Sequence, residues 1–140
     1  MRLQNLNMSI APALAEQVLE KMGLCHYPAL TESGLTKLYQ TWCRSVPFDN
    51  IRKRIQVSQG ISGDLPGFTP DDFFSHWLRF GTGGTCWASH GALYALLKAV
   101  GFSVQYGLST MRSPRPVSAD SPGHGTLFVR LNDERFIVDT

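Results

Sequence analysis

Apolar side chains recur at helical spacing along the first hundred residues. Leu14, Val18 and Met22 lie four residues apart and a glycine follows them, which predicts an amphipathic helix over residues 11–22. A second apolar stripe predicts a helix over residues 35–46. This helix ends before a proline, because the residue preceding proline is disfavoured in helical geometry.

Two further helices are predicted by their ends. In the segment TPDDFFSHWLRF, residues 69–80, Thr69 can cap the helix, proline suits its first turn, and two aspartates complement the helix dipole. A fourth helix is predicted over residues 86–100, closed by Gly101 at the left-handed position after its end. Residues 56–68, rich in glycine and serine, predict a loop between helices.

The hydrophobic period changes after the fourth helix. Three short segments rich in β-branched and aromatic residues predict strands: FSVQYGLST (102–110), GTLFVRL (125–131) and RFIVDT (135–140). The last two flank a short polar segment, as the strands of a hairpin do. Residues 111–123 carry three prolines and predict an exposed loop. Helices followed by strands indicate an α+β fold.

Composition narrows the class of protein. The chain has 140 residues, 43% of them hydrophobic and 17% charged, as expected for a soluble globular unit. A net charge of +2, from 13 basic and 11 acidic side chains, argues against nucleic-acid binding, and the basic run Arg52-Lys53-Arg54 reads as a solvated turn. No apolar stretch reaches the length of a signal peptide core or a membrane span, so we expect a cytoplasmic protein without membrane contact.

Three cysteines limit the metal and redox chemistry. Cys25, Cys43 and Cys86 are an odd number without a CxxC pair, which argues against a disulfide framework and against a zinc site. Cys86 differs from the other two because it lies where a glycine turn becomes a helix. The positive end of a helix dipole favours thiolate over thiol, as a nucleophile requires. The alternative is a small, inert, buried cysteine.

A nucleophilic thiol requires a base and a group that orients the base. Two of the four histidines, His26 and His76, are expected to be surface or core residues. His90 lies four residues after Cys86, on the same helix face, and a partly exposed helical histidine is an equal alternative. His124 stands between two glycines at a strand start, where its ring can be aimed across a cleft. Asp139 follows three apolar residues, so its carboxylate is expected to be buried near a strand end and to need a partner.

The hairpin allows a geometric test of this pairing. With Asp133-Glu134 as the turn, Asp139 would lie opposite Phe128, four residues from His124 and on the order of 13 Å away along a straight strand. Contact would then require a coil or bulge in the strand, and the glycines on either side of His124 are where a bend is expected.

Six segments taken together resemble the arylamine N-acetyltransferase family. In family order they are VLEKMGL, SVPFDNI, GGTCW, LLKAVGF, GHGTLFV and RFIVDT. The separations of 38 residues from 86 to 124 and 15 residues from 124 to 139 also match the family's pattern. The resemblance implies an N-terminal helical bundle, residues 1–85, followed by a nucleophile helix and the start of an antiparallel β-barrel, residues 86–140, with a Cys-His-Asp arrangement like that of thiol proteases.

The resemblance also implies roles for individual residues. Cys86 would accept the acetyl group from acetyl-CoA as co-substrate, His124 would take the thiol proton, and Asp139 would orient the histidine. An arylamine or hydrazine would then attack the thioester, and no metal is involved. Phe48 and Trp87 would line the acceptor pocket, although bulky apolar residues can equally belong to a core.

The chain departs from the family's pattern in two ways. Thr82, Ala88 and His90 stand where relatives usually have arginine, glutamate and asparagine, which removes groups that brace the nucleophile turn. The sequence also stops one residue after Asp139, whereas relatives continue through the barrel and an α/β region that helps form the coenzyme A cleft. We therefore expect a shortened chain that acylates its cysteine but transfers slowly, with a sheet edge that an oligomer or partner could cover.

Two alternatives to this function stay open. One is a related acyl transfer, such as amide synthesis or thioester hydrolysis. The other is a non-catalytic, degenerate domain that folds with a partner. Turnover of acetyl-CoA with and without an aromatic amine separates them.

Overall fold

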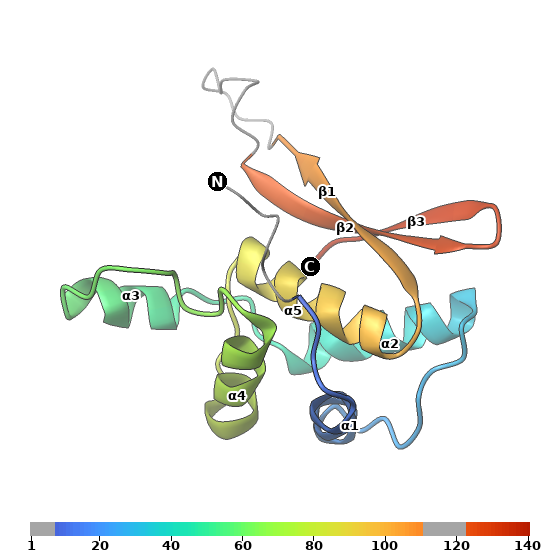
Figure 1. The fold of residues 1–140 in the computed structure, drawn as a ribbon, viewed down its shortest axis with the longest axis horizontal. Coiled ribbons are helices and arrows are strands. Elements are labelled where there is room, and N and C mark those ends of the chain that lie inside the picture. The colour runs from blue at the N-terminus through green and yellow to red at the C-terminus, as the bar shows by residue number, and fades with distance from the viewer. Residues whose placement is uncertain (1–7, 111–122) are drawn as a thin grey trace.

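A computed structural model describes residues 8–110 and 123–140. Within these residues, five helices precede a three-stranded antiparallel sheet, so the α+β prediction is confirmed (Figure 1). The elements are α1 (Pro12–Lys21), α2 (Glu32–Ser45), α3 (Ile51–Ser58), α4 (Pro70–Phe80), α5 (Cys86–Ala99), β1 (Ser103–Ser109), β2 (His124–Leu131) and β3 (Glu134–Val138). The loop expected over 111–123 lies outside the described residues except for Gly123.

Helix α5 forms the centre of the fold. It is apolar on most of its circumference, and Leu93, Leu96 and Leu97 are all fully buried. A helix without a polar face needs neighbours on several sides. Strands β1 and β2 cover one side of α5, and α4 and α1 contact it elsewhere. In Figure 1 the C-terminal segment ends between the sheet and α5. Because α5 packs against both helices and sheet, the division into domains at residue 85 stays a prediction.

An aromatic cluster joins α2 to α4. Trp42 stacks on Phe73 with ring centroids 6.2 Å apart and meets Phe74 edge-on at 6.1 Å. All three side chains are buried, together with Trp77. Edge-to-face and offset ring pairs add to the free energy gained by burying such large apolar surfaces. This cluster holds α2 and α4 together.

The predicted helix ends are confirmed at α4 and α5. The Thr69 hydroxyl accepts a hydrogen bond from the Asp72 amide at 3.2 Å, which caps the N-terminus of α4. Gly81 and Gly101, which follow α4 and α5, have φ values of 73° and 104°. Left-handed backbone of this kind is readily adopted only by glycine.

Helix α3 corrects the sequence analysis. The basic run over residues 52–54 lies inside this helix and not in a solvated turn, and the predicted loop begins only after Ser58. No residue of α3 is buried. The helix is fixed by polar contacts instead. Nη2 of Arg52 donates to both carboxylate oxygens of Asp72, at 2.9 and 3.0 Å. Ile51 and Ile55 do lie four residues apart in this helix, but the basic run between them led to the prediction of a turn.

The hairpin between β2 and β3 also differs from the expected register. Its turn is Asn132-Asp133, so Leu131 pairs with Glu134 and Leu127 pairs with Val138. Asn132 has a φ of 54°, a left-handed conformation that asparagine tolerates better than other side chains. The predicted turn Asp133-Glu134, and with it the placement of Asp139 opposite Phe128, was therefore wrong. Continuing the observed register places Asp139 level with Thr126, two residues from His124 and not four.

Among the described residues, no helix combines the length and the apolar composition needed to cross a membrane.

Candidate active site

The turn that precedes Cys86 is held by the segment around Asp49. The amide of Gly83 donates a hydrogen bond to the Asp49 carboxylate at 2.7 Å, and the amide of Asp49 donates to the Gly84 carbonyl at 3.2 Å. A Cβ atom on Gly83 would lie 1.7 Å from the carbonyl oxygen of Pro47. Only glycine allows this approach, so the SVPFDNI segment and the GGTCW segment are locked together.

A second contact engages the side chain of the N-cap residue of α5. Lys53 donates a hydrogen bond to the Thr85 hydroxyl at 2.6 Å. Thr85 occupies the N-cap position of α5, but its side chain makes no capping hydrogen bond. The first amides of α5 therefore lack a side-chain cap. Uncapped amides at the positive end of a helix can stabilise an anion near Cys86.

The three cysteines differ in exposure. Cys86 is half-buried at the first position of α5, whereas Cys25 and Cys43 are exposed. All three are free thiols, so the described part of the chain contains no disulfide between them. The Cys86 thiol makes no hydrogen bond with His124 among the described residues. The structure thus places the thiol at the helix start but does not bond it to a base.

His124 and Asp139 lie in direct contact. Nε2 of His124 is 2.7 Å from Oδ1 and 2.9 Å from Oδ2 of Asp139. An ionised carboxylate only accepts hydrogen bonds, so Nε2 carries the proton and donates it. The lone pair of Nδ1 then remains for the proton of a thiol. The Asp139 side chain is 44% exposed, which corrects the expectation that it is buried. The expected partner is nevertheless present.

Trp87 connects the nucleophile turn to the strand of His124. A Cβ atom on Gly125 would lie 3.0 Å from two atoms of the indole ring. Trp87 directly follows Cys86, and Gly125 directly follows His124, so this contact brings the two chain segments that carry the thiol and the imidazole next to each other. Trp87 is 47% and Phe48 62% exposed, so neither belongs to the core.

His90 is the most buried titratable group at the site, with 1% of its side chain exposed. The alternative of a partly exposed helical histidine is therefore wrong. Its Nδ1 donates to the carbonyl oxygen of Cys86 at 2.7 Å, and its Nε2 accepts from the amide of Thr140 at 3.1 Å. Burial lowers the pKa of His90, and the hydrogen bond to Cys86 and the charge of Asp139 offset this only in part.

His90, His124 and Asp139 could also hold a metal ion. Their ligand atoms lie within 4.8 Å of one another. Two imidazoles and a carboxylate are a donor set that suits several divalent metals. The hydrogen bonds described above already account for the proximity of the three groups, and the function proposed below uses no metal.

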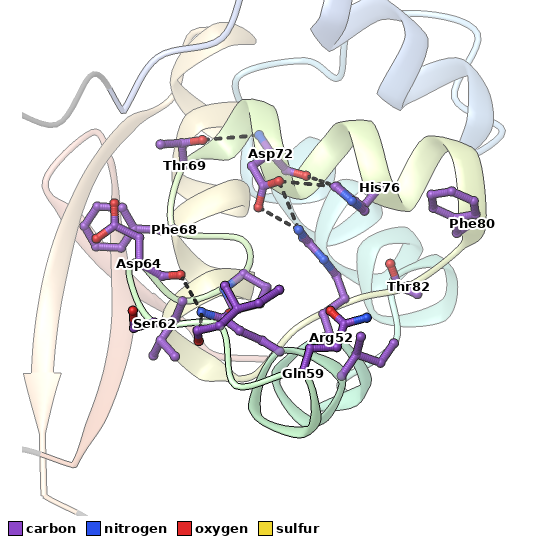
Figure 2. A pocket seen from close by; sticks show the side chains of 15 residues that line it. Arg52, Gln59, Ser62, Asp64, Phe68, Thr69, Asp72, His76, Phe80 and Thr82 are labelled. Carbon is purple, nitrogen blue, oxygen red and sulfur yellow. Dashed lines mark hydrogen bonds and ion pairs between the residues drawn. The ribbon is translucent and has the colours of Figure 1, made fainter.

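An open pocket of about 870 Å³ lies between α3, α4 and the loop that joins them (Figure 2). In Figure 2 the ion pair between Arg52 and Asp72 spans it, and His76 approaches the same carboxylate. Thr82 also lines the pocket, and its hydroxyl oxygen is buried without a hydrogen-bond partner among the described residues.

Sequence reasoning missed three residues of the site. Asp49 and Lys53 hold the nucleophile turn, and the Tyr39 hydroxyl donates to the main-chain carbonyl of Asp139. Asp49 belongs to the family-like segment SVPFDNI, which could have indicated its role. No pattern could have indicated Tyr39, because a tyrosine in the apolar stripe of α2 is expected to be a core residue. Of the braces expected to be lost at positions 82, 88 and 90, the one at position 90 is replaced by the His90 ring, which donates to the Cys86 carbonyl.

Comparison with known proteins identifies the class. The family model for N-acetyltransferases matches residues 33–140. The chain therefore belongs to the arylamine N-acetyltransferase family. A search of curated proteins found no match.

Solved structures agree with this assignment. The arylamine N-acetyltransferase of Salmonella typhimurium has a TM-score of 0.75 at 20% identity, covering 91% of this chain and 44% of the other. The M. tuberculosis enzyme has a TM-score of 0.68 at 19% identity, covering 88% and 45%. The M. smegmatis enzyme has a TM-score of 0.69 at 25% identity, covering 88% and 44%. The chain thus spans less than half the length of these proteins.

Proposed function

We propose that this chain transfers an acetyl group from acetyl-CoA, through Cys86, to an arylamine or hydrazine. The observation that carries the proposal is the hydrogen bond from His124 to the Asp139 carboxylate, beside the helix start that bears a half-buried cysteine. Membership of the arylamine N-acetyltransferase family supports the same chemistry. Three free thiols fit the cytoplasmic location expected from the sequence.

The first step forms an acetyl-cysteine. Nδ1 of His124 takes the thiol proton, and the Cys86 sulfur attacks the thioester carbonyl of acetyl-CoA. The uncapped amides of α5 stabilise the oxyanion of the tetrahedral intermediate. The carbon–sulfur bond to coenzyme A then breaks, and the departing thiolate takes the proton from the imidazolium. Asp139 keeps the proton on Nε2 and stabilises the imidazolium while it exists.

The second step returns the thiol. The amine nitrogen attacks the carbonyl of acetyl-Cys86, His124 removes a proton from that nitrogen, and the sulfur leaves and is reprotonated. Phe48 and Trp87 are exposed aromatic side chains beside the turn, so they can stack on the ring of an arylamine. We assign them to the acceptor site on this ground.

This chain offers few free cations to bind the phosphates of the acetyl donor, acetyl-CoA. Arg52 pairs with Asp72 and Lys53 bonds Thr85, so two cations of the basic run are already engaged, and Arg54 is the one left for coenzyme A phosphates. Binding energy from remote parts of a substrate accelerates the reaction as well as strengthening binding. We therefore expect acylation by a small activated ester to outpace acylation by acetyl-CoA.

Stopped-flow measurement with p-nitrophenyl acetate tests the proposal. We expect a burst of p-nitrophenol equal to the folded protein and absent in Cys86→Ala, with slower acylation by acetyl-CoA at the same concentration. Equal rates with both donors, and acceleration by an arylamine, would show a complete donor site. Turnover of the acyl-enzyme by water alone would assign a thioester hydrolase. No reaction of folded protein with either donor would assign the non-catalytic alternative.

A further inference from the structure

The peptide unit between Asp139 and Thr140 is held at both ends by helices. The Tyr39 hydroxyl on α2 donates to its carbonyl oxygen, and its N–H donates to Nε2 of His90 on α5. The Ser89 hydroxyl adds a contact to the Thr140 hydroxyl at 3.2 Å. All of this lies after the last residue of β3 that pairs with β2. Side chains from two helices, and not the sheet ladder, therefore set the position of Asp139.

The imidazole of His90 spans two main-chain groups. A carbonyl oxygen accepts at Nδ1 and an amide donates to Nε2, so Nδ1 carries the proton, Nε2 has none, and the ring is neutral. Burial, which lowers the pKa of His90, favours the same neutral form. One rigid ring thus ties the main chain of Cys86 to the main chain of Thr140.

The neutral form also leaves the Asp139 carboxylate to His124. Nε2 of His90 lies 3.1 Å from Oδ1 of Asp139, the same oxygen that His124 contacts at 2.7 Å. A proton on that nitrogen would donate to Oδ1 and release the Thr140 amide. The two rings meet edge to face with centroids 5.6 Å apart, so they share the carboxylate at close range.

We propose that His90 is a positioning residue for the acyl transfer proposed above: its ring joins the nucleophile helix to the residue after Asp139 and thereby holds the carboxylate against His124. The inference rests on the proposed function. His90 touches no reacting atom, because both ring nitrogens are bonded to main-chain groups.

Two substitutions separate the two ends of the ring. His90→Asn keeps a donor near Nδ1 for the Cys86 carbonyl but is too short to reach Thr140. His90→Gln places an acceptor near the site of Nε2 for the Thr140 amide but loses the Nδ1 donor. Tyr39→Phe, which removes one oxygen atom, loosens the same peptide unit from its other end. Thermal unfolding of each variant reports on folding separately.

The readouts are the burst rate with p-nitrophenyl acetate, the pH profile of Cys86 alkylation, and the NMR signal of the His124 Nε2 proton. We expect His90→Asn to slow acylation about 10-fold, to displace the pH profile and to broaden or shift the proton signal, because a group that orients a catalytic residue is worth that much. His90→Gln should stay within about threefold of the original chain, by the same argument, and Tyr39→Phe should lie between them.

Several outcomes would overturn the inference. Folded His90→Asn protein with unchanged rate, profile and proton signal would do so, and so would equal losses in His90→Asn and His90→Gln. A chain without substitutions that does not react with the ester would overturn the proposed function instead. The His124 proton signal would then still decide whether His90 positions Asp139.

Discussion

The ammonium group of Lys53 on α3 lies 2.6 Å from the hydroxyl oxygen of Thr85, the residue before Cys86. The Thr85 hydroxyl makes no capping hydrogen bond to the amides of α5. We expect Lys53→Met to let Thr85 cap its own helix, which raises the free energy of unfolding by up to about 1 kcal/mol while slowing acylation of Cys86. Lys37→Met, the same change at an exposed site on α2, should alter neither. Faster acylation in Lys53→Met would contradict this role of the uncapped amides.

Alkylation should single out Cys86 despite its lower exposure. Cys25 and Cys43 are exposed and Cys86 is only half-exposed, so accessibility alone favours the other two. The helix start and His124 favour the reactive thiolate at Cys86. We expect limiting iodoacetamide near neutral pH to modify Cys86 first, as peptide mapping would show. Uniform labelling of the three cysteines would argue against a nucleophile.

His124 should be the base of the thiol. We expect His124→Ala to slow alkylation of Cys86, because the substitution removes the Nδ1 lone pair that takes the thiol proton. His76→Ala serves as the control, since His76 contacts Asp72 on α4. Alkylation rates measured across pH compare the variants. Unchanged alkylation in His124→Ala would transfer the role to another group.

Gly83 should tolerate no side chain. A Cβ atom at this position would lie 1.7 Å from the Pro47 carbonyl oxygen, so the backbone must shift. We expect Gly83→Ala to lower the free energy of unfolding by about 1–3 kcal/mol and to abolish the burst with p-nitrophenyl acetate. Gly123→Ala is the matched control beside His124, because no atom of the described residues lies within 4 Å of its added Cβ. Urea unfolding and burst amplitude provide the two measurements.

Stability should fall in weakly acidic solution because of His90. Burial lowers its pKa in the folded state below the value of about 6.5 in unfolded chains, so the unfolded state binds more protons. The stabilisation is present above about pH 6.5 and is lost as the pH falls through the folded-state pKa. We expect His90→Asn to show a weaker pH dependence of urea unfolding between about pH 5 and 7.

Asp72 also affects stability through its lowered pKa, but in a different pH range from His90. Burial raises the pKa of Asp72, but hydrogen bonds from Gly67 and Arg52 outweigh burial and lower it overall. Its contribution is therefore lost only in strongly acidic solution, below about pH 4. An unaltered slope in His90→Asn between about pH 5 and 7 would mean that His90 titrates alike in both states.

The sequence predicted the elements that bury apolar surface. Helices α1, α2, α4 and α5 and all three strands have apolar periods or capping residues, and the structure confirms them. Helix α3 was missed because its apolar residues Ile51 and Ile55 are about half exposed, and because the ion pair and hydrogen bonds that fix the helix cannot be read from a sequence. The predicted hairpin register was wrong because the turn was placed at Asp133-Glu134 and not at Asn132-Asp133. Both pairs consist of polar residues that are acceptable in a turn, so composition did not distinguish them.

The candidate site was predicted in part. Cys86, His124 and Asp139 were named from their residue types and the family segments; the structure joins His124 to Asp139, and the catalytic roles of the three stay a prediction. Tyr39 is 100 residues from Asp139, and its hydrogen bond depends on how α2 packs against α5. Contacts to main-chain groups of this kind leave no trace in residue type. The role of His90 was open for the same reason.

The contacts after β3 separate the position of Asp139 from the length of the hairpin turn. The Tyr39 hydroxyl and the His90 ring hold the main chain on either side of the peptide bond between Asp139 and Thr140. The turn Asn132-Asp133 lies at the far end of the β2–β3 hairpin, so a residue inserted there changes the loop and leaves the pairing of Leu127 with Val138 as it is. Descendants of this sequence can therefore vary this turn in length and composition, whereas a change at Tyr39 or His90 acts on the carboxylate directly.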